Sequence, residues 1–211
     1  MGRLVFEGLK VLDFTWVAAG PILTQCLADH GAMVVRVESA TRPDILRMAP
    51  PYKDGKPGID RSGYFARFNS NKYGVSLNLN HPRAASVVRR LVAWCDVVVE
   101  NFTPGSMKAW GLDYESLRQM KPDLIMLSTS NQGQTGPHSR HPGHGGILTS
   151  LAGFTHLTGW PDREPCQAFG ALTDFTTPLL GAAALIGALE HRRRTGQGHY
   201  IDLSQYEASL L

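Results

Sequence analysis

Short apolar runs alternate along the chain with longer stretches whose apolar residues recur at the spacing of a helix. The runs rich in Val, Ile and Leu predict strands at residues 9–14, 33–39, 96–101, 124–130 and 199–204. The stretches between them predict helices at residues 22–31, 81–95, 147–153 and 178–194, and two short helical turns at 104–111 and 113–122. Strands separated by helices usually run parallel in one sheet. The pattern therefore predicts an α/β fold with a Rossmann-like, doubly wound, mostly parallel sheet covered by helices on both faces.

Two segments rich in Gly, Pro and polar residues interrupt this pattern. Residues 40–73 predict a long surface loop rather than a core element. Residues 131–146, NQGQTGPHSRHPGHGG, directly follow the predicted strand at 124–130 and therefore lie at its carboxyl end. Ligands of open α/β sheets bind at that edge, so we expect this second loop to lie beside a ligand.

The composition indicates a globular protein that binds a small anionic ligand rather than nucleic acid. Its net charge of +3 comes from 21 Lys and Arg against 18 Asp and Glu, which are spread along the chain without a long basic run. The three cysteines are far apart and lack CxxC spacing, which predicts reduced thiols and a cytoplasmic location. Each short apolar stretch near the start contains a charge, so neither a signal peptide nor a membrane association is predicted.

One carboxylate, Asp174, stands just before the long apolar stretch in ALTDFTTPLLGA. Thr177 is expected to cap the following helix and Pro178 to occupy its first position. The body of this helix is apolar on nearly all sides, which predicts a buried helix whose positive end points into the interior or a cleft. Asp174 is then expected to stay ionised. Local sequence favours a helix-capping role for Asp174, and attack on an activated carbonyl is the alternative.

The loop HSRHPGH contains three histidines at a spacing of three residues, His138, His141 and His144. A zinc site of this kind needs a fourth ligand and a suitable local geometry, and the interrupting Pro and Gly residues argue against it. We therefore predict no metal site. His144 is an exposed loop residue, a residue lining the ligand site or a general base. Glu38 stands where an NAD fold carries its ribose-binding acid, but the chain lacks GxGxxG, so dinucleotide binding is only weakly suggested.

Several stretches in a fixed order resemble the family III coenzyme A transferases. They include FEGLKVLDFTWVAAGP, GAMVVRVES, FNSNKYGVSLNLNHP, DVVVENFTPGSMKAWGLDYESLRQMKPDLIMLSTSNQGQTGP and TDFTTPLLGAAALIGALEHRRRTGQGHYIDLS. The resemblance implies that residues 1–211 form the N-terminal part of the family's large, Rossmann-like domain. A small domain and a C-terminal return segment would lie outside this chain. The family's subunits form interlocked dimers, which implies either a homodimer or completion of the site by a second CoA-transferase subunit.

The resemblance also implies the chemistry, which is transfer of CoA from an acyl-CoA to a small carboxylic acid. The family's nucleophile corresponds to Asp174, which would form a mixed anhydride and then an aspartyl-CoA thioester. CoA would be a substrate, and no permanently bound cofactor would be needed. The positions that match the family's CoA contacts are Ala18, Ala19, Leu77, Leu79, Asn78, Asn80, Asn101, Phe102, Thr103, Pro142, Gly143, His144 and Gly145.

The chain departs from the family pattern at three places. Ser39 and Ala109 replace basic residues that often contact the nucleotide, so we expect Arg42, Arg47 or Lys72 to take over these contacts. Related α-methylacyl-CoA racemases use a His and an Asp as paired bases, and His144 and Asp174 fall at the matching positions. Gly145 breaks the His-Asp dipeptide usual in racemases, which favours transfer. A non-catalytic CoA-binding subunit, with Asp174 only as a helix cap, is the third alternative.

Overall fold

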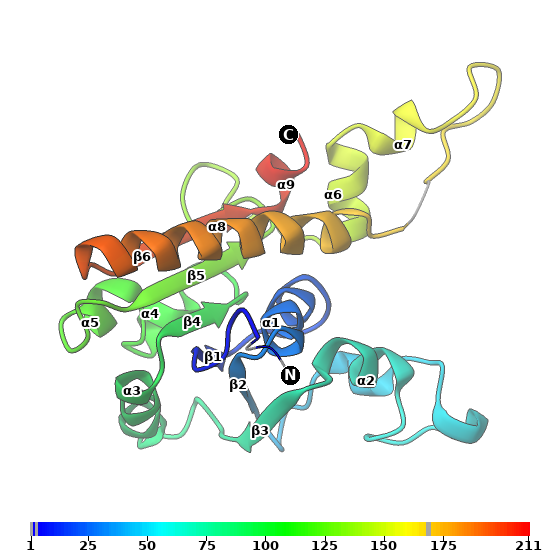
Figure 1. Ribbon diagram of the computed structural model, residues 1–211. Helices are drawn as coiled ribbons and strands as arrows, with labels where there is room; N and C mark the ends of the chain where they lie inside the picture. The colour runs from blue at the N-terminus through cyan, green and yellow to red at the C-terminus, as the bar shows by residue number, and fades with distance from the viewer. Residues whose placement is uncertain (1, 3, 168–169) are drawn as a thin grey trace.

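A computed structural model describes residues 2, 4–167 and 170–211, and its centre is one sheet of six parallel strands. The strands are β1 (Lys10–Asp13), β2 (Met33–Glu38), β3 (Lys72–Ser76), β4 (Val97–Glu100), β5 (Ile125–Ser130) and β6 (His199–Ser204). Their order is β3-β2-β1-β4-β5-β6, so the chain winds outward in one direction from β1 and in the other from β4 (Figure 1). The predicted α/β, doubly wound, parallel architecture is confirmed.

Helices cover both faces of this sheet. The longer ones are α1 (Ala19–Asp29), α2 (Gly63–Asn69), α3 (Ala84–Trp94), α6 (Gly145–Leu151) and α8 (Thr173–Thr195). The short ones are the 3-10 turns η1 (Ile45–Met48) and η2 (Lys53–Gly55), and α4 (Ser106–Ala109), α5 (Tyr114–Arg118), α7 (Phe154–Leu157) and α9 (Gln205–Ala208). Within the described part of the chain, none of the helices has the length and apolar composition needed to cross a membrane.

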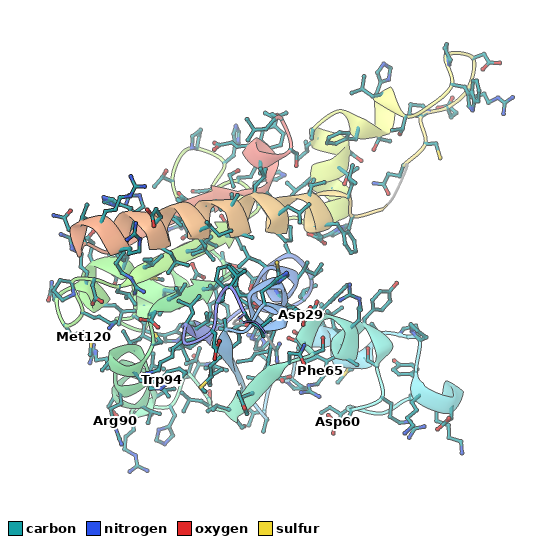
Figure 2. All side chains as sticks on the ribbon, viewed as in Figure 1. Asp29, Asp60, Phe65, Arg90, Trp94 and Met120 are labelled. Atoms are coloured by element: carbon teal, nitrogen blue, oxygen red, sulfur yellow. The ribbon has the colours of Figure 1, made fainter. Side chains whose placement is uncertain are left out.

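The alternation of side chains along the strands divides the core into two layers. On one face, α1 and α8 pack against Val97 and Val99 of β4, together with Leu127 of β5. On the other face, α3, α4 and α5 pack against Val98 of β4 and Met126 of β5. The central strands β1, β4 and β5 are buried on both sides, which is why their sequences are mostly continuous apolar runs rather than alternating ones. Figure 2 shows side chains filling the space between the sheet and its helices.

The prediction of a surface loop at residues 40–73 is wrong for the second half of this segment. Residues 63–69 form α2, which Ser62 caps by accepting the backbone N–H of Phe65 through its side chain. Residues 72–76 form β3, the edge strand beside β2. Both elements escape a hydrophobicity pattern because they carry few buried apolar side chains and depend on polar contacts with α1 and β2.

The helix after Asp174 also differs from expectation. It begins at Thr173 rather than near Pro178, so Thr177 lies inside it and does not cap it, and Pro178 is an internal proline. The additional first turn packs on α6, where the Thr173 hydroxyl donates to the Gly145 carbonyl over 3.3 Å. The helix is also not buried all round, because Leu179 and Ile186 on its outer side are 68% and 51% exposed. In Figure 1 this helix lies across β5 and β6 beside α1.

A segment beyond α7 projects from the body of the protein. Figures 1 and 2 show α7 and the chain that follows it extending away from the sheet. Leu157 and Trp160 in this segment are 74% and 72% exposed. The sheet and its two helical layers therefore carry the core without this segment.

Two glycines on α8 offer a matched test of the packing between α8 and α1. A Cβ on Gly181 would lie 2.2 Å from Leu23 Cδ1, whereas a Cβ on Gly187 meets nothing within 4 Å. We expect Gly187→Ala to raise the free energy of unfolding by up to about 1 kcal/mol through helix propensity. We expect Gly181→Ala to lower it by about 1–3 kcal/mol through overpacking. Equilibrium denaturation would check this, and equal effects at both sites would contradict the close α1–α8 contact.

Candidate active site

A cleft of about 390 Å³ opens at the carboxyl ends of β1 and β4. The strand order reverses between these two strands, and open α/β sheets bind their ligands at such a point. The loops after β1 and β4 form part of its wall, the two ends of the loop after β5 form another part, and the starts of α6, α8 and α9 complete it. The prediction that residues 131–146 approach this edge is therefore confirmed for the last part of that loop.

The cleft brings together most of the residues selected from the sequence. Ten of them line it, namely Ala18, Ala19, Asn101, Phe102, Thr103, Pro142, Gly143, His144, Gly145 and Asp174. Leu77, Asn78, Leu79 and Asn80 do not line it. Leu77 and Leu79 pack against the core on the α3 face, and the Trp110 indole N–H donates to Asn80 Oδ1 over 3.2 Å. Whether either set contacts CoA stays a prediction.

The turn after β1 is held in a strained conformation at the cleft wall. Asn101 Nδ2 donates to the carbonyl of Trp16, and Asn101 Oδ1 accepts the N–H of the same residue, both over 2.8 Å. The next residue, Val17, has a φ of 65° and donates its N–H to Asp44 Oδ2 over 3.1 Å. A β-branched residue in this region costs free energy, so its neighbours must hold it there. The side chain of Asn101 therefore shapes the cleft.

Asp174 lies in the first turn of α8 against the backbone of Gly145. A Cβ at position 145 would lie 2.6 Å from both Cγ and Oδ2 of Asp174, so only glycine leaves room for this carboxylate. The Gln205 amide donates to Asp174 Oδ1 over 3.3 Å. The close approach of Gly145 explains why a residue that breaks the racemase dipeptide stands here.

Burial raises the pKa of Asp174 above its ordinary value, while the hydrogen bond from Gln205 and the nearby His144 act in the opposite direction. The expectation that Asp174 stays ionised at the start of the helix remains a prediction. Desolvation opposes the ionised form, and the partners supplied by α9 and by the loop before α6 favour it.

His144 is engaged at one ring nitrogen. It stands at the start of α6, and its Nδ1 accepts the backbone N–H of Gly146 over 3.2 Å. Because Nδ1 accepts, the ring proton of the neutral imidazole is on Nε2. A neutral His144 in this arrangement has no free lone pair with which to remove a proton from a substrate. Among the described residues, no group of three His, Cys, Asp or Glu side chains is arranged to hold a metal ion.

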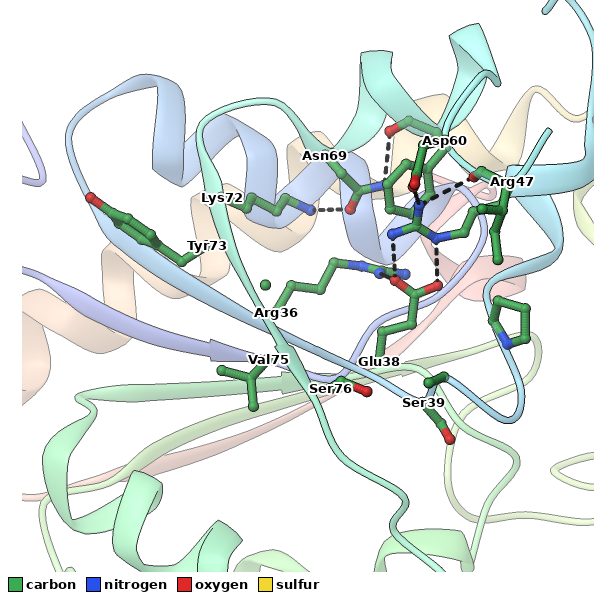
Figure 3. Close-up of a pocket in the computed structure, with 15 residues that line it drawn as sticks. Arg36, Glu38, Ser39, Arg47, Asp60, Asn69, Lys72, Tyr73, Val75 and Ser76 are labelled. Carbon is green, nitrogen blue, oxygen red and sulfur yellow. Dashed lines mark hydrogen bonds and ion pairs between the residues drawn. The ribbon is translucent and has the colours of Figure 1, made fainter.

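A second cavity, of about 510 Å³, lies at the carboxyl ends of β2 and β3 beside α2 (Figure 3). Arg47 crosses it and binds Glu38 through two hydrogen bonds of 2.7 and 2.9 Å. A further bond of 2.5 Å joins Arg47 to Asp60. Hydrogen bonds and the charges of Arg47 and Arg36 outweigh burial and lower the pKa of Glu38 to about 2. Glu38 is therefore committed to ion pairs with Arg47 and Arg36.

Arg47 and Lys72 were expected to take over nucleotide contacts, but both are already paired inside the protein. Lys72 is buried and donates to Asp13 Oδ2 over 3.1 Å, to the Pro21 carbonyl over 2.9 Å and to Asn69 Oδ1 over 3.1 Å. Both cations therefore have internal partners. Arg42 is exposed, and its guanidinium carbon lies 6.0 Å from the centroid of the Trp16 ring at the cleft wall. Of the three candidates, Arg42 is the one that the structure leaves accessible.

Two residues that shape this site were not among the candidates chosen from the sequence. Gln205 contacts the candidate nucleophile, and Asp44 holds the strained turn, yet neither belongs to a recognisable motif. One available signal was the position of Gln205 directly after the last predicted strand, because parallel strands bring their carboxyl ends to one edge. Asp44 gave no such signal, since it lies in a polar loop.

The fold and the cleft together define a doubly wound α/β protein with a partly buried carboxylate in a cleft at its topological switch point. Residues 6–211 match the family described as CoA-transferase family III, and the chain belongs to this family. It is 39% identical over 197 residues to the succinyl-CoA:glutarate CoA-transferase of Mus musculus, an alignment that covers 93% of this chain and 44% of that protein. It is 38% identical over 200 residues to the succinate–glutarate CoA-transferase of Agrobacterium fabrum, an alignment that covers 94% of this chain and 50% of that protein.

A solved structure agrees with these relatives. A CAIB/BAIF family protein from Brucella suis superposes with a TM-score of 0.92 at 36% identity, covering 99% of this chain and 55% of that chain. The chain therefore spans about half the length of the relatives that it matches.

Glu100, which precedes the cleft residues 101–103, offers a test of burial at this site. Burial raises the pKa of its carboxyl to about 7, against hydrogen bonds from Ser128 and from the Phe102 N–H. Between pH 4.5 and 7 the folded protein holds a proton that the unfolded chain releases, so the free energy of unfolding should fall as pH rises through this window. The change is at most about 3 kcal/mol.

The Glu100→Gln variant should lose this contribution because it cannot titrate. Denaturant unfolding from pH 4.5 to 8 would measure the difference between wild type and variant. Parallel pH dependences in the two proteins would contradict a buried, protonated Glu100.

Proposed function

We propose that this chain carries the CoA-binding site and the nucleophile of an acyl-CoA:carboxylate CoA-transferase. The observation that carries the proposal is the carboxylate of Asp174, partly buried in the wall of the switch-point cleft and fitted against Gly145. Family membership supports it, as do the relatives named as CoA-transferases. CoA and acyl-CoA are substrates in this proposal, and the protein's own side chains supply the chemistry.

The proposed reaction has two covalent stages. Asp174 Oδ2 attacks the thioester carbonyl of the donor, the C–S bond breaks, and CoA leaves as a thiolate from a mixed anhydride. The thiolate then attacks Cγ of Asp174, which releases the donor acid and forms an aspartyl-CoA thioester. The acceptor carboxylate attacks the same carbon and displaces CoA as a thiolate, which leaves a second mixed anhydride. The thiolate finally attacks the acceptor's acyl carbon, so that the acceptor's CoA thioester forms and Asp174 is released as a free carboxylate. Each stage exchanges one activated acyl group for another, so the steps stay close in free energy.

A small dicarboxylic acid is the acceptor class that we propose. The two relatives described above are named for succinate and glutarate, both dicarboxylates. Arg140 is exposed and carries the permanent positive charge among the described residues that line the cleft. A guanidinium suits a carboxylate because its fork of donors can bind both oxygens.

A racemase that uses His144 and Asp174 as paired bases is the alternative, since both residues line the same cleft. The hydrogen bond from the Gly146 N–H to His144 Nδ1 argues against it, because that base would have to give up its bond at the start of α6. Exchange of the substrate's α-hydrogen with deuterium, in the absence of an acceptor acid, would favour the racemase.

The remaining proposals concern the whole protein. We infer that this chain is the N-terminal part of the family's large domain, with a small domain and a return segment contributed from outside it. The length of its relatives supports this inference. An interlocked homodimer, or pairing with a second CoA-transferase subunit, would complete the site, and a cytoplasmic location suits its acyl-CoA substrates.

Asp174→Asn tests the nucleophile. The amide keeps the size of the side chain but cannot attack, so we expect CoA transfer by the full-length protein to fall by about 10³-fold or more. Hydroxylamine trapping during turnover should convert Asp174 of the wild type to a hydroxamate, detectable by mass spectrometry of its peptide.

The exposed Asp162 gives a matched control, and Asp162→Asn should transfer CoA at the wild-type rate. Full activity of Asp174→Asn would overturn the proposal and leave a non-catalytic CoA-binding role.

Gly145→Ala tests the fit between Gly145 and the carboxylate. The added methyl group would force Asp174 away from its present position, and a displacement of about 1 Å can reduce turnover by about 100-fold. We expect that loss in kcat, with folding retained. Gly187→Ala, where the methyl group meets nothing, is the control. Activity of Gly145→Ala within a few-fold of wild type would show that the carboxylate position is not critical.

A further inference from the structure

Gln205 is a buried polar residue at the active-site edge of the sheet. It begins α9 directly after β6, and it lines the cleft. The β5–β6 register places the preceding residue, Ser204, opposite Ser130, which lines the cleft as well. Ser204 caps α9 by accepting the Glu207 N–H over 3.2 Å. Gln205 itself is 7% exposed. Its side chain is therefore held by the fold and directed at the site.

The orientation of the Gln205 amide indicates what it binds. Its Nε2 donates to Asp174 Oδ1 over 3.3 Å, while its Oε1 is buried and has no hydrogen-bond partner within the described ranges. Turning the amide over would set Oε1 against a carboxylate oxygen, which is unfavourable when Asp174 is ionised. The amide N–H therefore hydrogen-bonds the carboxylate, and the amide's own carbonyl oxygen is left without a hydrogen bond.

The two oxygens of Asp174 have different fates in the proposed reaction. The oxygen that attacks the donor becomes the bridging atom of the anhydride and leaves with the donor acid when the thiolate attacks Cγ. The other oxygen remains the carbonyl of the aspartyl intermediate. Each attack on Cγ pushes an electron pair onto that carbonyl oxygen, which returns it when the leaving group departs. A donor fixed on the retained oxygen would therefore stabilise both tetrahedral states.

We propose that Gln205 is the donor that holds Asp174 Oδ1, first positioning the carboxylate so that Oδ2 attacks and then stabilising negative charge on Oδ1. The proposal rests on the proposed function, because it needs Asp174 to be the nucleophile. It assigns a catalytic contact to a residue outside the CoA-contact positions inferred from the family resemblance.

Other groups near Asp174 do not provide the same contact. His144, at the start of α6, is a titratable side chain that favours the ionised form of Asp174. Gly145 contributes no side chain, and Glu207, the acidic residue of α9, is exposed. Removing the Gln205 donor therefore leaves Oδ1 without its hydrogen bond and should shift the acid limb of the kcat/KM profile to higher pH.

The test uses Gln205→Met, which keeps the side-chain length without a donor, and Gln205→Glu, which places a negative charge beside Asp174. The full-length protein would be treated with an acyl-CoA donor to form the aspartyl-CoA intermediate, which would then be isolated. An acceptor carboxylate would discharge this intermediate in a stopped-flow instrument. We expect the discharge rate per mole of intermediate to fall about 10- to 100-fold in Gln205→Met, and further in Gln205→Glu. A purely structural defect would reduce the amount of intermediate but not its rate of discharge.

The exposed Gln119 provides the control, and Gln119→Met should discharge its intermediate at the wild-type rate. Carbon-13 NMR titration of the Asp174 carboxyl gives a readout that needs no turnover, and its pKa should rise in Gln205→Met. Unchanged discharge and an unchanged Asp174 pKa in that variant would overturn the role of Gln205. Absence of any Asp174 adduct in the wild type would instead overturn the proposed function, and the titration would still decide the contact.

Discussion

The buried carboxylate of Asp13 is the interaction on which the active-site edge depends. It stands at the carboxyl end of β1 and accepts hydrogen bonds from the Thr15 N–H over 2.8 Å and from the Thr24 hydroxyl over 2.6 Å. It also pairs with Lys72 of β3 over 3.1 Å. One charged group therefore ties together the turn after β1, helix α1 and the edge strand. Because Asp13 and Lys72 are both buried, loss of either would leave the other charge unpaired in the interior.

A similar principle, a partly buried carboxylate matched by a few partners, operates in the cleft. Asp174 is accommodated because Gly145 has no side chain and because α9 supplies an amide donor. The turn after β1 forms another part of the wall, where Asn101 and Asp44 hold the strained Val17. The cleft is thus assembled from loops that follow separate strands, and the parallel sheet brings them to one edge.

Much of this arrangement follows from local patterns. Short runs rich in apolar residues identified five of the six strands, and the central strands β1, β4 and β5 are apolar over most of their length because they are buried on both faces. The exception, β3, has a mostly exposed sequence and exists because it pairs with β2 and because Lys72 reaches Asp13. The start of α8 was misplaced for a similar reason. Its first turn precedes an internal proline and is held by contact with Gly145, which local helix signals do not report.

By itself, the sequence determined the alternation of strands and helices and the burial of the central strands, because each depends on residue type and spacing within a short segment. The candidate nucleophile came instead from the resemblance of many ordered segments to one family, since the local sequence around Asp174 favours a helix cap. Tertiary structure alone decided which charges are available to a ligand. Arg47 and Lys72 resemble free cations in the sequence but are committed to Glu38 and Asp13 in the fold. It also decided that Gln205 meets Asp174, since residues 31 positions apart become neighbours only when β6 docks beside β5.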